Sequence, residues 1–441
     1  MALSTQPYKG ARDFYPEDKR LQKYIFSNLR RVVEQFGYQE YDAPILEPLE
    51  LYLAKTGEEI VNEQTYSFTD RGGRQVVIRP EMTPTVSRMV AARRQQLAYP
   101  LRWYSIPNLW RYERPQKGRL REHWQLNVDI FGISSLEAEV ETISLMSQIL
   151  NSFGAQPKMY RIRLNSRKLM DSILRDYLKL GSDEAKKIAQ LIDRMHKLER
   201  TEFISQADSL LSAESKQNGA TEKLLDVLGA KDFRDLPKLL STHASAIQLE
   251  QLIDRLKKAG IKNAQFDPSL MRGFDYYTDI VFEIFDTHPD NNRSLFGGGR
   301  YDGLVGLFGV DPIPTVGFGM GDVTLSNFLE GHHLLPQLSS ETDIWVALIG
   351  PVYDKCSSLL TGLRRQGLNL AVDFSGRKLG DQLKAAQKNG LMNVLIIGEK
   401  ELTEDLFTLK DLSSGSEQKV SSSELSELLI KQHRKKQDDS H

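Results

Sequence analysis

The chain has 441 residues, enough for two or three domains with substantial hydrophobic cores. Its 58 lysines and arginines almost balance its 59 aspartates and glutamates, which excludes a general polyanion-binding protein and requires any nucleic-acid contact to come from local patches. A single cysteine, Cys356, excludes a disulfide framework, and the lack of a long apolar run or signal peptide predicts a cytoplasmic protein without membrane contact.

The N-terminal part begins with a predicted helix. Pro16 precedes two acidic residues, as helix starts prefer, and apolar residues then recur at three- and four-residue steps as far as Phe36. Gly37 ends this pattern. The stretch that follows is broken by Pro44 and Pro48, and by itself it indicates only an edge strand or a loop.

A hairpin and a second helix are predicted between residues 66 and 90. The run RGGR at 71–74 forms the turn of the hairpin, and its second strand ends at Pro80. Glu81 and Thr83 then lead into a helix with apolar periodicity. Because the free N–H groups at a helix start favour carboxylates and hydroxyls, helix capping is the simplest role that the residues alone give to these two side chains.

A polar hairpin over residues 104–132 is the most informative stretch. Its first strand reads WYSIPNLWRY, and its second alternates polar and apolar residues over 123–130, which predicts one buried face and a polar face carrying Gln125 and Asp129. Guanidinium groups pair bidentately with phosphate, so the basic link suits a polyanionic ligand beside a small polar one. A solvated charged hairpin is the alternative. The cations around Glu113 are Arg111, Arg114, Lys117, Arg119 and Arg121.

The middle of the chain is predicted to be mainly helical. A strand, YRIRLNS, precedes residues 166–260, whose periodicity and mixed charge indicate a helical insertion with solvated faces. The sheet resumes with a strand predicted over 274–284, in which Tyr276 and Tyr277 point to opposite faces. The glycines at 297–299 allow backbone to pack under a ligand.

A polar linker around residues 331–343 leads to a C-terminal region in which short apolar strands alternate with helices. This pattern predicts a mostly parallel sheet covered by helices. Near its strand ends, Arg377, Lys378 and Lys384 are candidate RNA contacts, with solvated helix faces as the alternative. The eight histidines lack metal-ligand spacing, so no metal site built from protein ligands alone is predicted.

Several motifs give the chain a family resemblance. WRYERPQKGR followed by HWQLNVDIFG resembles motif 2 of the class II aminoacyl-tRNA synthetases, in the form used by histidyl-tRNA synthetases. RPEMT resembles the RPE-x-T segment of that family, and RGFDYY resembles its histidyl-specific RG-x-DYY segment. YQEYDAPILEPLELY resembles motif 1, which implies a homodimer. The resemblance covers most of the chain, apart from the middle of the insertion and the tail.

The resemblance implies activation of L-histidine by ATP, with Mg²⁺, to histidyl-adenylate and transfer of histidine to the 3' end of tRNA(His). It implies Arg111 and Arg272 as the catalytic pair at the α-phosphate, with the Glu and Thr of RPE-x-T on the α-amino group. The implied histidine-binding residues are Glu81, Thr83, Arg111, Gln125, Asp129, Arg272, Tyr276 and Tyr277. The implied ATP-binding residues are Arg111, Glu113, Arg119 and Arg272.

Two positions depart from the family pattern. Motif 3 normally reads G-x-G-x-E-R, but Thr324 stands where its arginine is expected. Either another cation compensates, Arg119 or Arg121 for example, or ATP binds more weakly. Asp129 is one methylene shorter than the glutamate that the family uses beside the imidazole, so a water or a small strand shift is expected to fill the gap.

The sequence therefore predicts an α+β protein with a class II synthetase catalytic domain on an antiparallel sheet. The expected domains are catalytic over 1–165 and 261–335, a helical insertion over 166–260 and an α/β domain over 342–441. The resemblance implies that the insertion lies near the tRNA acceptor arm, and the α/β domain resembles the anticodon-binding domain that histidyl-tRNA synthetases share with the prolyl, threonyl and glycyl enzymes. Two rival functions are a histidine-sensing regulatory subunit of ATP phosphoribosyltransferase and a tRNA-binding paralogue without ligase activity. The RGFDYY segment, the C-terminal domain and the retained pocket residues favour the ligase, whereas the altered motif 3 favours the rivals.

Overall fold

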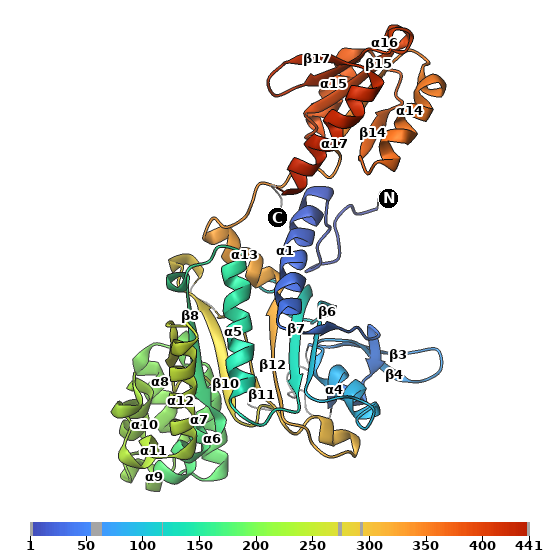
Figure 1. The fold of residues 1–441 in the computed structure, drawn as a ribbon. Coiled ribbons are helices and arrows are strands. Elements are labelled where there is room, and N and C mark those ends of the chain that lie inside the picture. Colours follow the sequence, from blue (N-terminus) through green and yellow to red (C-terminus); the bar gives the residue numbers. More distant parts are fainter. Residues whose placement is uncertain (1–2, 54–63, 117, 272–275, 292–293, 439–441) are drawn as a thin grey trace. The chain divides into compact units, whose positions relative to one another are not determined.

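The computed structural model describes residues 3–53, 64–116, 118–271, 276–291 and 294–438. The chain forms two compact units (Figure 1), one of Met1–Asp13 with Tyr24–Leu335 and the other of Phe14–Lys23 with Pro336–His441. Both units mix helices with sheet, which confirms the predicted α+β class.

The body of the first unit is a nine-stranded sheet. Its order is β1-β5-β7-β12-β11-β10-β8-β9, with β6 paired to β7 beside this path. All its pairs are antiparallel except two at the edges, β1 with β5 and β8 with β9. The strands are β1 (Gln39–Glu40), β5 (Leu101–Ser105), β6 (Asn108–Trp110), β7 (Glu122–Phe131), β8 (Tyr160–Ser166), β9 (Ala264–Phe266), β10 (Ile280–Asp286), β11 (Ser294–Arg300) and β12 (Thr315–Gly321).

The polar hairpin differs from its prediction in two respects. The first predicted strand is two strands, β5 and β6, interrupted at Ile106 and Pro107, and both pair antiparallel with β7. The prediction that the second strand has only one buried face is wrong. This strand, β7, lies inside the sheet, and both of its faces are covered from Leu126 onward. Asn127 and Asp129 on its polar face are each only 4% exposed.

A smaller sheet and helix α4 (Thr83–Ala92) lie before β5 in the chain. The small sheet has the order β2-β4-β3, formed by β2 (Leu46–Pro48), β3 (Tyr66–Thr69) and β4 (Gln75–Ile78). The predicted hairpin turn is confirmed, since Gly73 has a φ of 77° and the N–H of Asp70 donates to the carbonyl of Arg74. The cap residue of α4 is Met82.

Further helices of the first unit are α2, α5, α13 and the part of α1 that begins at Tyr24. The predicted first helix is α1 (Pro16–Gln35), which ends before Gly37, a residue with a φ of 81°. Helix α5 (Glu137–Ser152) runs along one face of the sheet (Figure 1). Helix α13 (Asp322–Gly331) follows β12 and packs against β7 and β11. The short helix α2 (Glu50–Leu53) packs on α4 through the buried Tyr52.

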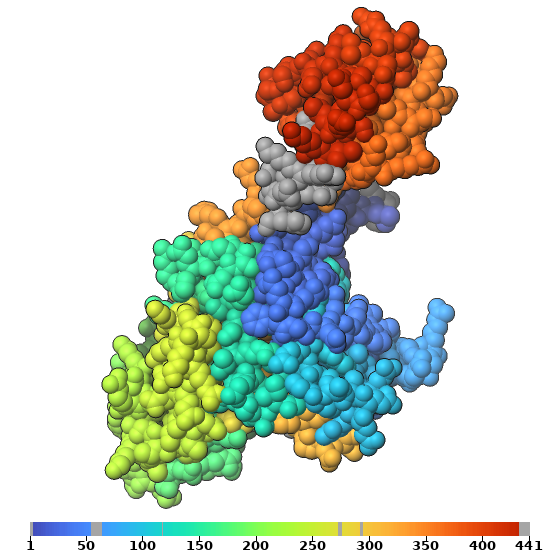
Figure 2. Space-filling view, viewed as in Figure 1, coloured from blue at the N-terminus to red at the C-terminus, as the bar shows by residue number. Residues whose placement is uncertain are grey.

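The predicted helical insertion is confirmed between β8 and β9. It forms a lobe beside the sheet body, yellow-green in Figure 2. Its buried faces carry Leu, Ile, Ala and Phe side chains at helical spacing, as in α12. Its helices are α6 (Arg167–Ser172), α7 (Ser182–Asp193), α8 (Arg200–Leu210), α9 (Ala213–Gln217), α10 (Ala220–Gly229), α11 (Lys238–Ser241) and α12 (Ala244–Lys258).

The second unit contains a five-stranded sheet in the order β14-β13-β15-β16-β17. The prediction of a mostly parallel sheet is wrong, because β14, β13 and β15 are parallel but β16 and β17 add two antiparallel pairs. No helix in the described part of the chain is long and apolar enough to cross a membrane. The elements of the second unit are β13 (Ile344–Ile349), α14 (Tyr353–Arg365), β14 (Leu370–Asp373), α15 (Leu379–Lys388), β15 (Asn393–Gly398), α16 (Glu399–Glu404), β16 (Phe407–Asp411), β17 (Glu417–Val420) and α17 (Ser422–Asp438).

Candidate active site

A cavity of about 360 Å³ opens on the sheet of the first unit, and strands β7, β11 and β12 contribute to its lining. The structure brings together at this cavity every predicted site residue that it describes. Arg272 lies outside the described residues. The predicted residues that line the cavity are Glu81, Thr83, Arg111, Glu113, Arg119, Gln125, Asp129, Tyr276 and Tyr277.

The floor of the cavity requires glycine in β12. An added Cβ at Gly317 would overlap Oδ1 of Asp129, and one at Gly319 would overlap Nε2 of Gln125. These two side chains project from β7 across the neighbouring strand, where any larger residue would displace them. The glycines of β12 therefore create the space that the polar face of β7 occupies.

Asp129 has a partner that the sequence analysis did not single out. The hydroxyl of Tyr301 donates a hydrogen bond to Oδ1 of Asp129, and Tyr301 itself lines the cavity. Burial raises the pKa of Asp129 to about 7, although the Tyr301 hydroxyl acts to lower it. Burial and the Asp129 charge together hold the pKa of Tyr301 well above its usual value, so the phenol stays protonated. No local signal in the sequence identified Tyr301, because it reaches Asp129 only through the order of the sheet.

Beside Asp129, a chain of polar groups runs along β7. Nε2 of Gln125 donates to Oδ1 of Asn127 at 2.9 Å, and Nδ2 of Asn127 donates to the carbonyl of Gln125 at 3.0 Å. His123 hydrogen-bonds to Gln125, while burial, followed by the cations Arg111 and Arg12, lowers its pKa to about 3. His123 is therefore a neutral side chain at neutral pH, and the amide of Gln125 is held in one orientation.

Aromatic rings form one wall of the cavity. Tyr276 and Tyr277 have ring centroids 4.6 Å apart, and the ring of Tyr301 stands nearly perpendicular to Tyr276 at 5.7 Å. The expectation that the two adjacent tyrosines point to opposite faces is wrong, because β10 begins only at Ile280 and both rings reach the cavity. Tyr276 also hydrogen-bonds to Thr83, which joins this wall to the start of α4.

The cationic side of the cavity comes from the hairpin before β7. Nε of Arg111 donates to the carbonyl of Pro80 at 2.9 Å, which fixes the guanidinium beside Glu81 and Thr83. Arg119 is 65% exposed and lies 3.5 Å from Glu113.

Arg121 is engaged elsewhere, because its guanidinium stacks 4.0 Å from the ring centre of Tyr112 and donates to the hydroxyl of Tyr8 at 3.1 Å. Arg119 lines the cavity and Arg121 does not. Of the two cations expected to compensate for the altered motif 3, Arg119 is thus the one available at the cavity.

At the altered position of motif 3, the hydroxyl of Thr324 forms hydrogen bonds within the protein. Thr324 lines the cavity, and its hydroxyl donates to the carbonyls of Leu295 at 2.8 Å and Gly321 at 3.1 Å. Asp322, the first residue of α13, accepts the N–H of Trp124 at 3.0 Å and pairs with Arg12 at 2.7 Å. Among the residues that the structure describes, no three His, Cys, Asp or Glu side chains are grouped so as to hold a metal ion.

Family models and curated relatives match most of the chain. Residues 10–323 match the family model of histidyl-tRNA synthetase, and residues 343–432 match that of an anticodon binding domain. The chain is 44% identical over 424 residues to the histidine–tRNA ligase of Leptospira biflexa, covering 96% of both chains. It is 39% identical over 430 residues to that of Thermoplasma volcanium, covering 97% of this chain and 99% of the relative.

The fold is also found among solved structures. It resembles the crystal structure of histidyl-tRNA synthetase from a Nostoc species with a TM-score of 0.80 at 23% identity, covering 98% of this chain and all of the other. At that identity the similarity supports the fold alone.

Proposed function

The chain belongs to the histidyl-tRNA synthetase family, and we propose how its residues divide the work of the reaction. The protein is a histidine–tRNA ligase of class II. It activates L-histidine with ATP to histidyl-adenylate and pyrophosphate, then transfers the histidyl group to tRNA with release of AMP. The observation that supports our residue roles is one cavity lined by the histidine-side and phosphate-side candidates together.

The histidine end of the site lies over β7. We assign the imidazole to Gln125 and Asp129, because a neutral imidazole has one donor and one acceptor nitrogen and needs a polar partner at each. Glu81 and Thr83 bind the α-amino group, since both line the cavity at the start of α4. The rings of Tyr276 and Tyr277 close the pocket around the side chain.

The phosphate end lies under the basic hairpin. The carboxylate of histidine attacks the α-phosphate of ATP, and negative charge grows on the phosphate oxygens as pyrophosphate leaves. Arg111 stabilises this charge from a fixed position, because its Nε is already held by the carbonyl of Pro80. Arg272, outside the described residues, is the second cation in this proposal.

We propose that Arg119 binds the outer phosphates of ATP. Its side chain is exposed at the cavity and only loosely paired with Glu113, so a phosphate can replace the carboxylate. Glu113 would be the carboxylate that holds a Mg²⁺ ion arriving with the nucleotide, since it lines the same cavity. When bound, Mg²⁺ neutralises the charge of the phosphates.

Recognition of tRNA(His) is assigned to the insertion at the acceptor end and to the second unit at the anticodon. At the carboxyl ends of β13 and β14, Phe374 is 66% exposed and meets Tyr353 edge-on at 4.8 Å. Exposed aromatic rings stack on unpaired bases, and Arg377 beside them adds a cation. We propose catalytic regions over 1–165 and 261–335, the insertion over 166–260 and the anticodon-binding domain over 342–441.

The assembly and location that we propose are a homodimer in the cytoplasm. Support for the dimer comes from the motif 1 stretch, in which Ile45 and Leu46 are 47% and 45% exposed. Apolar side chains grouped in this way gain stability by being covered in an interface.

Aminoacylation tests the proposal. The purified protein, supplied with ATP, Mg²⁺ and tRNA(His), is expected to attach histidine and no other amino acid to the RNA. Phe374→Ala is expected to reduce charging while histidine-dependent pyrophosphate exchange stays unchanged, and Phe308→Ala, an exposed aromatic of the first unit, is the matched control. Attachment of another amino acid, or none, would contradict the proposed function.

A further inference from the structure

On both sides of the two cavity tyrosines, Tyr276 and Tyr277, the chain is hydrogen-bonded to the same short region. This region, which we call the junction anchor, is residues 165–168, where β8 passes into α6, the first helix of the insertion. Upstream of the tyrosines, Nδ2 of Asn165 donates to the carbonyls of Leu270 at 3.0 Å and Pro268 at 3.3 Å. None of the anchor residues lines the cavity.

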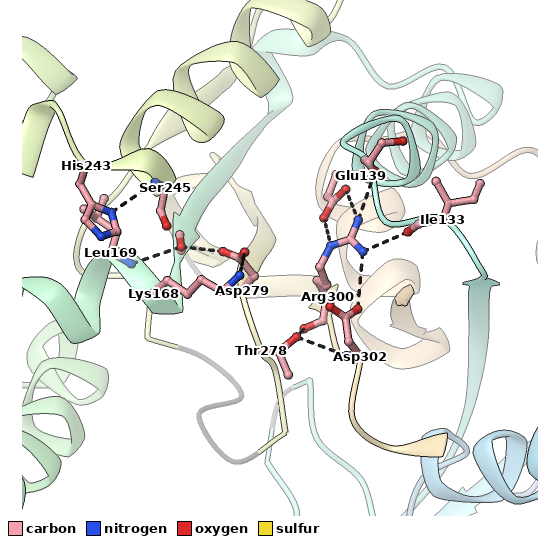
Figure 3. A network of polar contacts seen from close by, with 12 residues as sticks. Ile133, Glu139, Lys168, Leu169, His243, Ser245, Thr278, Asp279, Arg300 and Asp302 are labelled. Carbon is pink, nitrogen blue, oxygen red and sulfur yellow. Dashed lines mark hydrogen bonds and ion pairs between the residues drawn. The ribbon is translucent and has the colours of Figure 1, made fainter. Parts of the chain in front are cut away.

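Downstream of the tyrosines, the anchor holds both backbone and side chain. Nη1 of Arg167 donates to the carbonyl of Tyr277 at 2.9 Å, and its backbone N–H donates to the carbonyl of Asp279 at 3.0 Å. The buried carboxylate of Asp279 accepts the hydroxyl of Ser166 at 2.8 Å and pairs with Nζ of Lys168 at 2.7 Å (Figure 3).

Ser166 connects the contacts of Asp279 to the first helix of the insertion. Its hydroxyl oxygen also accepts the N–H of Leu169 at 3.3 Å, so the residue that caps α6 is the residue that holds Asp279. The other side of the tyrosine stretch is fixed as well, since the N–H of Thr278 donates to the carbonyl of Arg300 at 2.7 Å. Arg300 in turn forms a buried ion pair with Glu139 at 2.7 Å (Figure 3).

We propose that Asp279, held by the junction anchor, is a positioning residue for histidine binding. It acts through Arg167, whose backbone N–H donates to the carbonyl of Asp279 and whose Nη1 donates to the carbonyl of Tyr277. The ring of Tyr277 in turn lies against Tyr276 at the cavity wall. A small displacement of such groups weakens binding strongly, because the rings must meet the substrate in one geometry. The inference rests on the proposed function. It adds that hydrogen bonds and an ion pair link the first turn of the insertion to the amino-acid pocket.

Two substitutions test this proposal. Asp279→Asn keeps an oxygen that can accept the Ser166 hydroxyl but loses the charge that attracts Lys168. Lys168→Met removes the same ion pair from the other side, at a side chain that is 61% exposed, so the fold is expected to survive the change. Lys168→Arg keeps the charge and serves as the conservative variant. The matched control is Asp183→Asn, which breaks the exposed pair with Lys187 within the same insertion.

The readouts are the KM for histidine and for ATP in pyrophosphate exchange, the Kd of histidine by calorimetry, and the melting temperature. Asp279→Asn is expected to raise the histidine KM and Kd about tenfold, the scale of losing a charged hydrogen bond, with the ATP KM changed less than about twofold. Lys168→Met is expected to act in the same direction, Lys168→Arg to restore the wild-type values, and Asp183→Asn to change neither.

Histidine constants that stay at the wild-type level in Asp279→Asn and Lys168→Met would overturn the proposal, as would an equal rise in both KM values. A wild-type protein that neither binds histidine nor exchanges pyrophosphate would instead contradict the proposed function, and the inference would fall with it.

Discussion

The hydroxyl of Tyr301 donates a hydrogen bond to Oδ1 of Asp129, so a residue that follows β11 orients the carboxylate on β7. The two strands are separated by β12, whose glycines leave the space between them open. The shorter aspartate at this position is thus held by a protein hydroxyl, and the water or strand shift expected beside the imidazole stays a prediction.

Tyr301→Phe is expected to weaken histidine binding selectively. It removes the hydrogen bond without removing the ring, and a buried acceptor that loses its donor costs about 1–1.5 kcal/mol. The histidine KM should rise about tenfold while the ATP KM stays nearly constant. Tyr160→Phe is the control, since its buried hydroxyl bonds to Ser147 at 2.8 Å and does not line the cavity. Equal effects of the two variants on the histidine KM would refute the role of Tyr301.

Asp129 is expected to make the stability of the unliganded protein depend on pH. Burial raises its pKa to about 7, whereas an unfolded chain has a value of about 3.9. The contribution of the buried neutral acid is therefore full below about pH 4 and is lost as the pH rises through about 7. Asp129→Asn should raise the melting temperature more at pH 8 than at pH 5, as differential scanning calorimetry can measure. Parallel curves of melting temperature against pH would contradict the burial of a titrating carboxyl group.

Two glycine substitutions in neighbouring strands should separate binding from folding. In Gly319→Ala, the new methyl group meets only the flexible end of Gln125, so the fold should survive while the histidine KM rises about tenfold. In Gly298→Ala, the methyl group meets the backbone of β12, so the protein should lose about 1–3 kcal/mol of unfolding free energy. Gly303→Ala, which meets nothing, is the control for both measurements. A Gly319→Ala protein with normal histidine affinity would exclude Gln125 from the pocket.

The fold class was predictable because its main signals are local. The periodicity of α1, the turn at 71–74 and the strand YRIRLNS depend on residues close in sequence, and each was found as expected. The helical insertion followed from the periodicity of residues 166–260, and the antiparallel sheet from the family resemblance. The mixed sheet of the second unit was missed because nothing in the apolar run of β16 records the direction of its neighbour.

The site was predictable as a set of residues but not as an arrangement. The resemblance named the residues that line the cavity, yet burial of the polar face of β7 depends on β12, more than 180 residues later in the chain. Tyr301 was missed for the same reason, because only the sheet order brings it to Asp129. The neighbouring rings of Tyr276 and Tyr277 result from an irregular backbone before β10, which alternation cannot reveal.

Arg119→Ala is expected to affect ATP more than histidine. With Thr324 bonded to backbone carbonyls, Arg119 and Arg111 are the arginines among the described lining residues, and Arg119 is the exposed one. Removing its phosphate contact should raise the ATP KM about tenfold or more and leave the histidine KM within about twofold. Arg114→Ala, an exposed arginine of the same hairpin outside the lining, should change neither constant. An unchanged ATP KM in Arg119→Ala would mean that motif 3 is compensated elsewhere.

The most direct measurement is histidine-dependent exchange of pyrophosphate into ATP, made on the intact protein and on Arg111→Ala. The wild-type protein is expected to exchange pyrophosphate with histidine and with no other amino acid. Arg111→Ala should be about a hundredfold slower at the same histidine concentration, the scale of losing one preorganised donor at the reacting phosphate. An intact protein without histidine-dependent exchange, or an Arg111→Ala protein as fast as wild type, would contradict adenylate formation in this cavity.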